Sequence, residues 1–288
     1  IRTIYDLQAD DPETRFAAVR AAGHDISPEV RTRLLKISES SEETPEIKAA
    51  AERSLKRIQQ TLDRYAVIET LFFGLSLGSI LVLAAIGLSI TFGVMGVINM
   101  AHGELMMLGA YTTYVIQLML PDALGYSLLI AIPSAFVVSG LVGIAIERGI
   151  IRFLYGRPLE TLLATFGVSL VLQQAVRSIF SPLNRSVASP EWMSGSLEIV
   201  QGLSITYSRL YIFIFTLIVF TALWLVMQRT RLGLEVRAVT QNRAMAKAMG
   251  INTTRVDILT FGLGAGIAGV AGVALSQLTN VGPNPVSY

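Results

Sequence analysis

The sequence contains no cysteine, two histidines and few charged residues. The absence of cysteine excludes disulfides and thiolate metal sites. The two histidines, His24 and His102, lie too far apart in the chain to suggest a metal site. Charged residues make up 15% of the 288 residues, whereas a soluble chain carries about 25%. The net charge of +2 gives no sign of a surface for nucleic acid. We therefore expect neither a metal site nor a nucleic-acid partner.

Charge is missing altogether from residues 70 to 101, a run of 32 positions. At about 1.5 Å per residue, a helix over this run is longer than one bilayer crossing. Apolar segments at 67–92, 105–120, 123–146, 161–180, 210–228 and 258–278 predict six membrane helices. The fold class we predict is all-α: a polytopic transmembrane helical bundle over residues 65–288, which interacts with the lipid bilayer.

Three glycines in the last of these segments, Gly264, Gly266 and Gly269, match the G-x-G-x-x-G pattern of a dinucleotide site. A fourth, Gly262, lies four residues before Gly266. No strand precedes the pattern and it lies inside an apolar helix, so a phosphate-binding role is disfavoured. Small residues at this spacing let membrane helices approach closely. We predict that the four glycines serve helix packing.

Residues 1–64 have a different character, with three Pro-Glu pairs at Pro12, Pro28 and Pro45 that each precede an amphipathic stretch. Proline in the first turn, followed by an acidic residue, is typical of a helix start. We predict a small soluble helical accessory domain, similar to helical repeats of the HEAT type. The missing initiator methionine suggests a processed leader or an incomplete start.

A polar cluster interrupts the apolar sequence at Asn99, His102 and Glu104. Polar groups at membrane depth are costly and usually functional. Two interpretations stay open: the three side chains line a solute path, or they only satisfy the backbone at a helix break. A serine-protease pair of Ser169 with His102 is a third interpretation, which we disfavour because serine is common in membrane helices.

The segment from Arg229 to Val256 is rich in basic residues, which marks it as cytoplasmic. Within it, the sequence predicts a short helix with Asn242 as the N-cap and Gly250 as the terminator. Such a helix could dock on a partner, although an ordinary basic loop is the plainer alternative. A second basic loop follows residue 146, and helix counting puts both loops on one side. Residues 181–209 and the amino-terminal domain are then expected outside the cytoplasm.

Two segments together resemble the signatures of the branched-chain amino-acid and urea permease family of ABC importers. The first is Gly96-Val97-Ile98-Asn99-Met100-Ala101-His102-Gly103-Glu104 followed by Gly109-Ala110-Tyr111, and the second runs from Arg231-Leu232-Gly233 through Arg237-Ala238 to Ala248-Met249-Gly250-Ile251-Asn252. The resemblance extends from about Thr70 to the end of the chain. It implies a multi-pass permease subunit of a bacterial inner membrane, with no catalysis and no cofactor of its own.

The resemblance also implies partners and coupling residues. The partners are a second homologous permease, two cytoplasmic ATPase subunits that bind ATP, and a periplasmic solute-binding protein. The coupling loop would include Glu235, Arg237, Asn242, Lys247, Gly250 and Asn252. The chain departs from the wider ABC permease class by lacking a Glu-Ala-Ala run before Gly250. Family members also continue for roughly two further membrane helices, so carboxyl-terminal helices are expected to be missing here.

The solute that we expect from the sequence is urea. An amino-terminal extension resembles the urea permeases more than the amino-acid permeases, and the scarcity of intramembrane charge favours a neutral solute over a zwitterion. The alternatives are a branched-chain amino-acid permease and, from a different class, a passive channel for small neutral solutes. A channel would not need the basic loop. The extension, residues 1–64, is expected in the periplasm.

Overall fold

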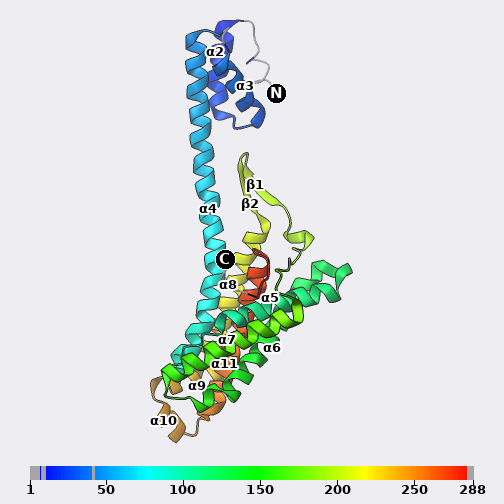
Figure 1. The fold of residues 1–288 in the computed structure, drawn as a ribbon. Helices are drawn as coiled ribbons and strands as arrows, with labels where there is room; N and C mark the ends of the chain where they lie inside the picture. The colour runs from blue at the N-terminus through cyan, green and yellow to red at the C-terminus, as the bar shows by residue number, and fades with distance from the viewer. Residues whose placement is uncertain (1–6, 8–10, 41–42, 284–288) are drawn as a thin grey trace. The chain divides into compact units, whose positions relative to one another are not determined.

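The computed structural model describes residue 7, residues 11–40 and residues 43–283 of the chain. The chain divides into two compact units. Unit 1 comprises the described residues up to Gly74 together with Gly195–Tyr207. Unit 2 comprises Leu75–Ser194 and the described residues from Ser208 onward. Figure 1 follows the chain from the amino-terminal helices in blue to the last helix, which is drawn from orange to red.

Unit 1 contains α2 (Pro12–Ala21), α3 (Pro28–Glu39) and the first part of α4 (Pro45–Met95), which passes into unit 2 after Gly74; each of the three helices begins at a proline. Proline suits this position because an N–H in the first turn has no partner inside the helix. The carboxylate of Asp11 caps α2 by accepting the Thr14 N–H at 3.1 Å. The helices and the 3-10 turn η1 (Ala22–His24) enclose a core that includes Val19, Val30, Leu34, Ala51 and Ile58.

Helix α4 continues without interruption for 51 residues. The third amino-terminal helix and the first membrane helix, which the sequence analysis treats as separate, are therefore one element. The reason is local, because residues 59–73 contain neither glycine nor proline and nothing in them ends a helix. At 1.5 Å per residue, α4 is about 75 Å long.

Unit 1 also contains a hairpin that the sequence analysis treats as loop. Its strands, β1 (Ser196–Val200) and β2 (Leu203–Thr206), pair antiparallel across Gln201 and Gly202. Gly202 has a φ of +86°, a conformation that glycine adopts without steric cost. All five residues of β1 are exposed, so the strand lacks the apolar alternation that reveals a half-buried strand in a sequence.

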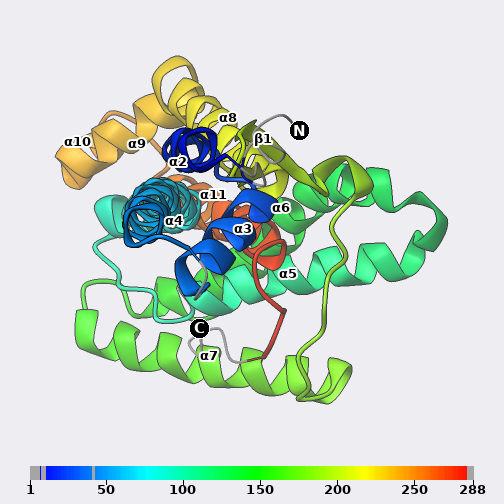
Figure 2. The same cartoon turned by 90° about the horizontal axis from the view of Figure 1, so that it is seen from above.

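Unit 2 confirms the predicted all-α helical bundle. After α4 come α5 (His102–Met119), α6 (Leu124–Gly149), α7 (Pro158–Phe180), α8 (Tyr207–Arg229), α9 (Arg231–Gln241), α10 (Arg243–Ala248) and α11 (Thr253–Ser276). Short 3-10 turns lie at η2 (Pro121–Ala123), η3 (Ile151–Phe153) and η4 (Glu191–Met193). Figure 2 shows α7 along one edge of this unit, with α8, α9 and α10 on the opposite side.

Five helical segments of the described chain are long and apolar enough to cross a membrane: α4, α6 with its flanking turns, α7, α8 and α11. Helix α5 corresponds to the second of the six crossings predicted from the sequence, and it is not long and apolar enough to be counted among the five. It spans 18 residues and contains His102, Glu104 and Gln117. Much of α5 is buried against α6 and α11, so protein rather than lipid surrounds its polar side chains.

Helix α11 forms the centre of unit 2, with 78% of its most apolar window buried. A β-carbon added at Gly109 of α5 would lie 2.0 Å from the Gly269 carbonyl oxygen, and one added at Gly264 would lie 2.7 Å from that of Gly87. Gly262 and Gly266 lie against Ile144 and Phe136 of α6. Backbones this close leave no room for side chains, which is the geometry that small residues permit between membrane helices.

Candidate functional site

The polar cluster lies where α4 stops and α5 begins. Helix α4 ends at Met95, and Gly96 follows with a φ of +65°, the left-handed conformation that commonly ends a helix. The Asn99 side chain accepts the Ala101 N–H at 3.0 Å, and the Thr165 hydroxyl of α7 accepts the Met100 N–H at 3.2 Å. Asn99 therefore supplies a hydrogen bond that the broken helix lacks.

Glu104 is 3% exposed and joins α5 to α7. Its Oε1 accepts one hydrogen bond from the Ser169 hydroxyl and one from the Gln173 amide, both at 2.7 Å. Its Oε2 is buried and has no hydrogen-bond partner among the described residues. A buried carboxylate oxygen without a donor costs free energy, so Glu104 is only half satisfied by its surroundings.

His102 points toward α4. Its Nε2 lies 2.9 Å from the Ala84 carbonyl oxygen, and Gly87 leaves the space that the ring occupies, since a β-carbon there would lie 3.3 Å from the ring. Ser169 donates to Glu104 instead of pairing with His102. The nucleophile–base pair of a serine protease is therefore not formed.

The three candidate residues thus share the helix break but have different partners, and Glu104 lines a cavity. This cavity of about 650 Å³ lies between α4, α5 and the carboxyl-terminal end of α11. Three methionines, Met100, Met106 and Met107, and two leucines of α4 supply much of its apolar lining. Glu104, Ser276, Thr279 and Asn280 supply its polar side chains. The cavity therefore combines an apolar wall with one carboxylate.

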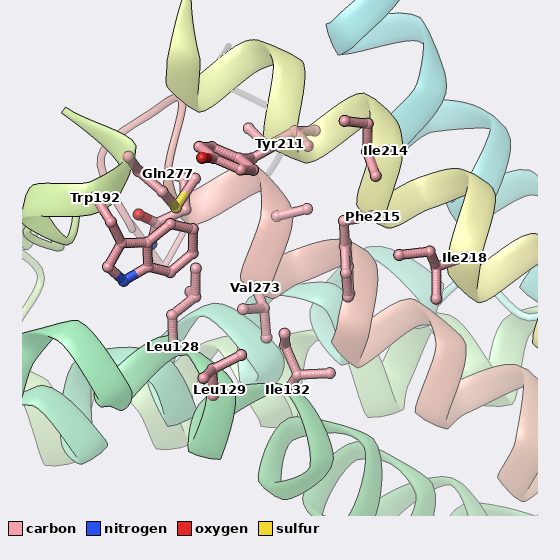
Figure 3. A pocket seen from close by; sticks show the side chains of 13 residues that line it. Leu128, Leu129, Ile132, Trp192, Tyr211, Ile214, Phe215, Ile218, Val273 and Gln277 are labelled. Atoms are coloured by element: carbon pink, nitrogen blue, oxygen red, sulfur yellow. The ribbon is translucent and has the colours of Figure 1, made fainter. Parts of the chain in front are cut away.

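A second hollow has a different character. Figure 3 shows apolar side chains of α6, α8 and α11, among them Leu128, Phe215 and Val273, lining a pocket of about 170 Å³. Trp192, Tyr211 and Gln277 are the lining residues with polar side-chain atoms, and none of them is charged. A charged or strongly polar solute would lose its hydration there without compensation. The Glu104 cavity is the better candidate for a solute path.

The basic segment after α8 folds into α9 and α10. Asn242 caps α10 by accepting the Met245 N–H at 2.9 Å. At the other end, Gly250 has a φ of +88°, Gly250 N–H donates to Lys247 O and Ile251 N–H donates to Ala246 O, a Schellman motif. Asn252 then caps α11 by accepting the Arg255 N–H at 3.1 Å. Three of the predicted coupling residues thus fix where helices begin and end.

Apolar side chains divide the α9–α10 hairpin into two faces. Val236, Val239 and Ala246 are buried against Val256 of α11. On the outer face, Leu234, Met245 and Met249 are 62%, 60% and 77% exposed.

Lys247 is exposed as well, and Arg237 donates to the Met227 carbonyl at the end of α8. Glu235 is half-buried and forms no ion pair among the described residues. Exposed apolar groups rimmed by polar ones are typical of a protein interaction surface.

Comparison with known proteins decides the family. Residues 70–287 match the model of the branched-chain amino acid transport system permease component. The chain belongs to this permease family. It is 34% identical over 222 residues to the high-affinity branched-chain amino acid transport system permease protein BraD of Pseudomonas aeruginosa, and 35% identical over 224 residues to LivH of Escherichia coli K12, a protein of the same description. Each alignment covers 74% of this chain and 72% of the relative. No solved structure shows significant similarity to the chain.

These relatives refine the expectation about the solute. Both are named for branched-chain amino acids, so they favour the alternative of the sequence analysis over urea. The match begins at residue 70, and the amino-terminal extension on which the urea expectation depends lies outside it. Both relatives are named as permease proteins of a transport system.

The sequence analysis does not predict one cluster of the permease, the contact of Arg243 with Asp257 and Tyr155. Arg243 at the start of α10 forms a two-pronged ion pair with Asp257 of α11, with one N–O distance of 3.1 Å, and its guanidinium lies 4.2 Å from the centre of the Tyr155 ring. Burial, together with the charge of Asp257, raises the pKa of Tyr155 to about 12, so its hydroxyl stays protonated. We call these three residues the α10 clamp. No spacing rule joins them in the sequence, because their contact depends on tertiary packing.

Proposed function

We propose that this chain is a membrane permease subunit of an ABC-type importer for branched-chain amino acids, and that the Glu104 cavity forms part of its translocation path. Membership of the permease family supports the class, and the names of the relatives support the solute. The observation that carries the proposal is the cavity itself, in which one half-satisfied carboxylate faces an apolar wall.

The chemistry of the cavity suits a branched aliphatic amino acid. The free oxygen of Glu104 would pair with the ammonium group of the solute, because a buried carboxylate gains most from a charged donor. Methionine side chains adapt to irregular apolar shapes, so Met106 and Met107 would accommodate a branched side chain. The solute carboxylate would find its cation elsewhere, and a second homologous permease subunit is the expected source.

The energy for transport would come from ATP hydrolysis in two cytoplasmic partner subunits, to which the exposed face of α9 and α10 would bind. The α10 clamp would transmit their movement to α11. Since α11 contacts α4, α5 and α6 at glycine backbones, a shift of α11 would also displace these helices, because close-packed backbones leave no free space between them. A periplasmic solute-binding protein would deliver the solute from the other side of the inner membrane.

One observation favours urea as a second candidate. No arginine, lysine or histidine belongs to the described lining of the Glu104 cavity. A zwitterion would leave its carboxylate unpaired unless another subunit supplies a cation, which is costly in a low dielectric. Urea is neutral and needs only donors and acceptors of hydrogen bonds.

The decisive experiment is ATPase stimulation in the reconstituted transporter. The chain would be assembled with its second permease and ATPase subunits in lipid nanodiscs, with the binding protein added. We expect leucine to raise the ATPase rate several-fold and urea to leave it unchanged. Stimulation by urea alone would transfer the assignment to urea. No stimulation by either solute, in an assembly that hydrolyses ATP, would contradict the branched-chain proposal.

A further inference from the structure

Three arginines and one histidine of unit 1 line one groove, which lies outside the residues that match the permease family. Arg20 of α2 and His24 of η1 line one wall, while Arg53 and Arg57 of α4 line the other. The groove has a volume of about 650 Å³, within the range of small-molecule sites. We call it the arginine groove.

The small residues of the two helices explain why the groove exists. Ala17 and Ala21 of α2 face Ala50 of α4 across it, so no large side chain fills the space. At its floor, the hydroxyl of Ser54 donates to the Val19 carbonyl at 2.8 Å, and Gly23 lies so close that an added β-carbon would be 3.1 Å from the Ser54 oxygen. Helix-to-helix contact therefore fixes the distance between the two cationic walls.

The charge arrangement is unfavourable for folding by itself. Arg53 and Arg57 are four residues apart on α4. Like charges at this spacing destabilise a helix by a few tenths of a kcal/mol. The helix dipole accounts for Arg20, which lies in the last turn of α2. It does not account for Arg53 and Arg57, which lie in the interior of a 51-residue helix.

Neighbouring carboxylates do not neutralise the groove. None of its described lining residues is acidic. The ion pair found in the described part of unit 1 joins Arg15 to Glu43 at 2.7 Å, and it involves none of the four groove residues. The side chains of Arg20, His24, Arg53 and Arg57 are exposed. Their donors are thus available to a ligand.

We propose that the arginine groove binds a compact anion with two or more negative charges, of the phosphate or polycarboxylate class. Guanidinium groups present paired N–H donors that match both phosphate and carboxylate oxygens. Two guanidinium groups from α4 face a third guanidinium and an imidazole across the groove. This number of donors suits an anion with several charges better than an anion with one charge. The apolar face of Phe16 borders the groove and would contact any carbon skeleton that the anion carries.

Isothermal titration calorimetry on the full chain in nanodiscs tests the proposal. The probes are pyrophosphate and citrate, with acetate as the single-charge control, all at one ionic strength. We expect pyrophosphate or citrate to bind, acetate not to bind, and the double variant Arg53→Gln/Arg57→Gln to weaken binding at least tenfold. The matched control Lys36→Gln/Lys56→Gln removes two exposed charges of the same domain outside the groove and should change the dissociation constant by less than twofold.

The melting temperature separates binding from a structural role. Because the two arginines repel each other, Arg53→Gln/Arg57→Gln should melt at the same temperature as the parent chain or higher. A lower melting temperature without any anion would show that the arginines stabilise the domain, and would overturn the proposal. Equal binding in both double variants would place the anion elsewhere. Binding of a polyglutamate peptide alone, with neither small anion, would replace the proposal with an acidic protein partner.

Discussion

The two oxygens of Glu104 differ in their partners. Oε1 accepts hydrogen bonds from Ser169 and Gln173 of α7, whereas Oε2 is buried without a partner among the described residues, and in our proposal it binds the solute. The sequence marks Glu104, Asn99 and His102 equally, as polar residues at a break. It cannot distinguish them, because the distinction depends on Ser169 and Gln173, which lie 65 and 69 residues further along the chain.

Substitution of Glu104 separates its contact with α7 from its proposed contact with the solute. Glu104→Gln keeps an oxygen for Ser169 and Gln173 but removes the charge, so leucine uptake should fall about tenfold, near 1.4 kcal/mol, with little loss of folded protein. Glu104→Ala leaves both donors unpaired, at a cost of about 1–3 kcal/mol, and should lower uptake and melting temperature together. Uptake in membrane vesicles, divided by the amount of folded transporter, measures the difference. Uptake that simply follows folded protein in both variants would reduce Glu104 to an anchor for α7.

At the scale of elements, the sequence is most informative where a single residue ends a helix. Asn242 and Gly250 indicate α10 because capping and a positive φ have narrow residue requirements. The β1–β2 hairpin and the continuity of α4 are not evident, because neither has a local signal of that kind. The α10 clamp is invisible for another reason, since Tyr155 and Arg243 meet only after the helices have packed.

Gly250 provides a test of the α10 terminus. Gly250→Val forces a β-branched residue into the left-handed region, at a cost of about 1–2 kcal/mol or more, and should uncouple ATP hydrolysis from uptake. Gly250→Asn is the matched control, because asparagine tolerates this conformation, and it should retain most uptake. The ratio of solute imported to ATP hydrolysed is the quantity to measure. An unchanged ratio in Gly250→Val would show that the shape of this turn is irrelevant to coupling.

The α10 clamp can be dissected with a double variant. Arg243→Gln leaves Asp257, which is 3% exposed, as a buried charge without a partner, and should destabilise the protein by about 3–5 kcal/mol. Arg243→Gln/Asp257→Asn removes both charges and should restore much of the melting temperature. Coupling should stay impaired in both variants, since both lose the ion pair between α10 and α11. Full coupling in a stable double variant would rule out a role for the clamp beyond folding.

At the scale of the whole molecule, the predicted topology depends on two basic loops lying at one end of unit 2. Tyr155, from the loop after α6, contacts Arg243 of α10, so the two loops do meet. Segment 181–194 lies at the other end, where the backbone N–H of Ala188 donates to Gln117 and the Trp192 indole donates to the Gly125 carbonyl. From the enrichment in lysine and arginine we predict that the first end faces the cytoplasm. The periplasmic position of residues 1–64 stays a prediction, which requires that α4 crosses the membrane once.

Cysteine labelling tests this orientation in a chain that has no cysteine of its own. Ser40→Cys should react with a membrane-impermeant maleimide in spheroplasts, whereas Thr240→Cys in α9 should react only after the cells are opened. Labelling of both positions after opening serves as the control for accessibility. The reverse pattern would overturn the orientation and with it the assignment of α9 and α10 to the cytoplasmic partner.

Solute protection of a single cysteine in the cavity tests the central claim most directly. Ser276 lines the Glu104 cavity and is 4% exposed, whereas Ser189 lies exposed in segment 181–194. In the assembled transporter, Ser276→Cys should react with a small methanethiosulfonate reagent, and leucine should slow that reaction several-fold while the reaction of Ser189→Cys stays unchanged. Reaction of Ser276→Cys at the same rate with and without leucine, in a transporter that still imports leucine, would contradict the account.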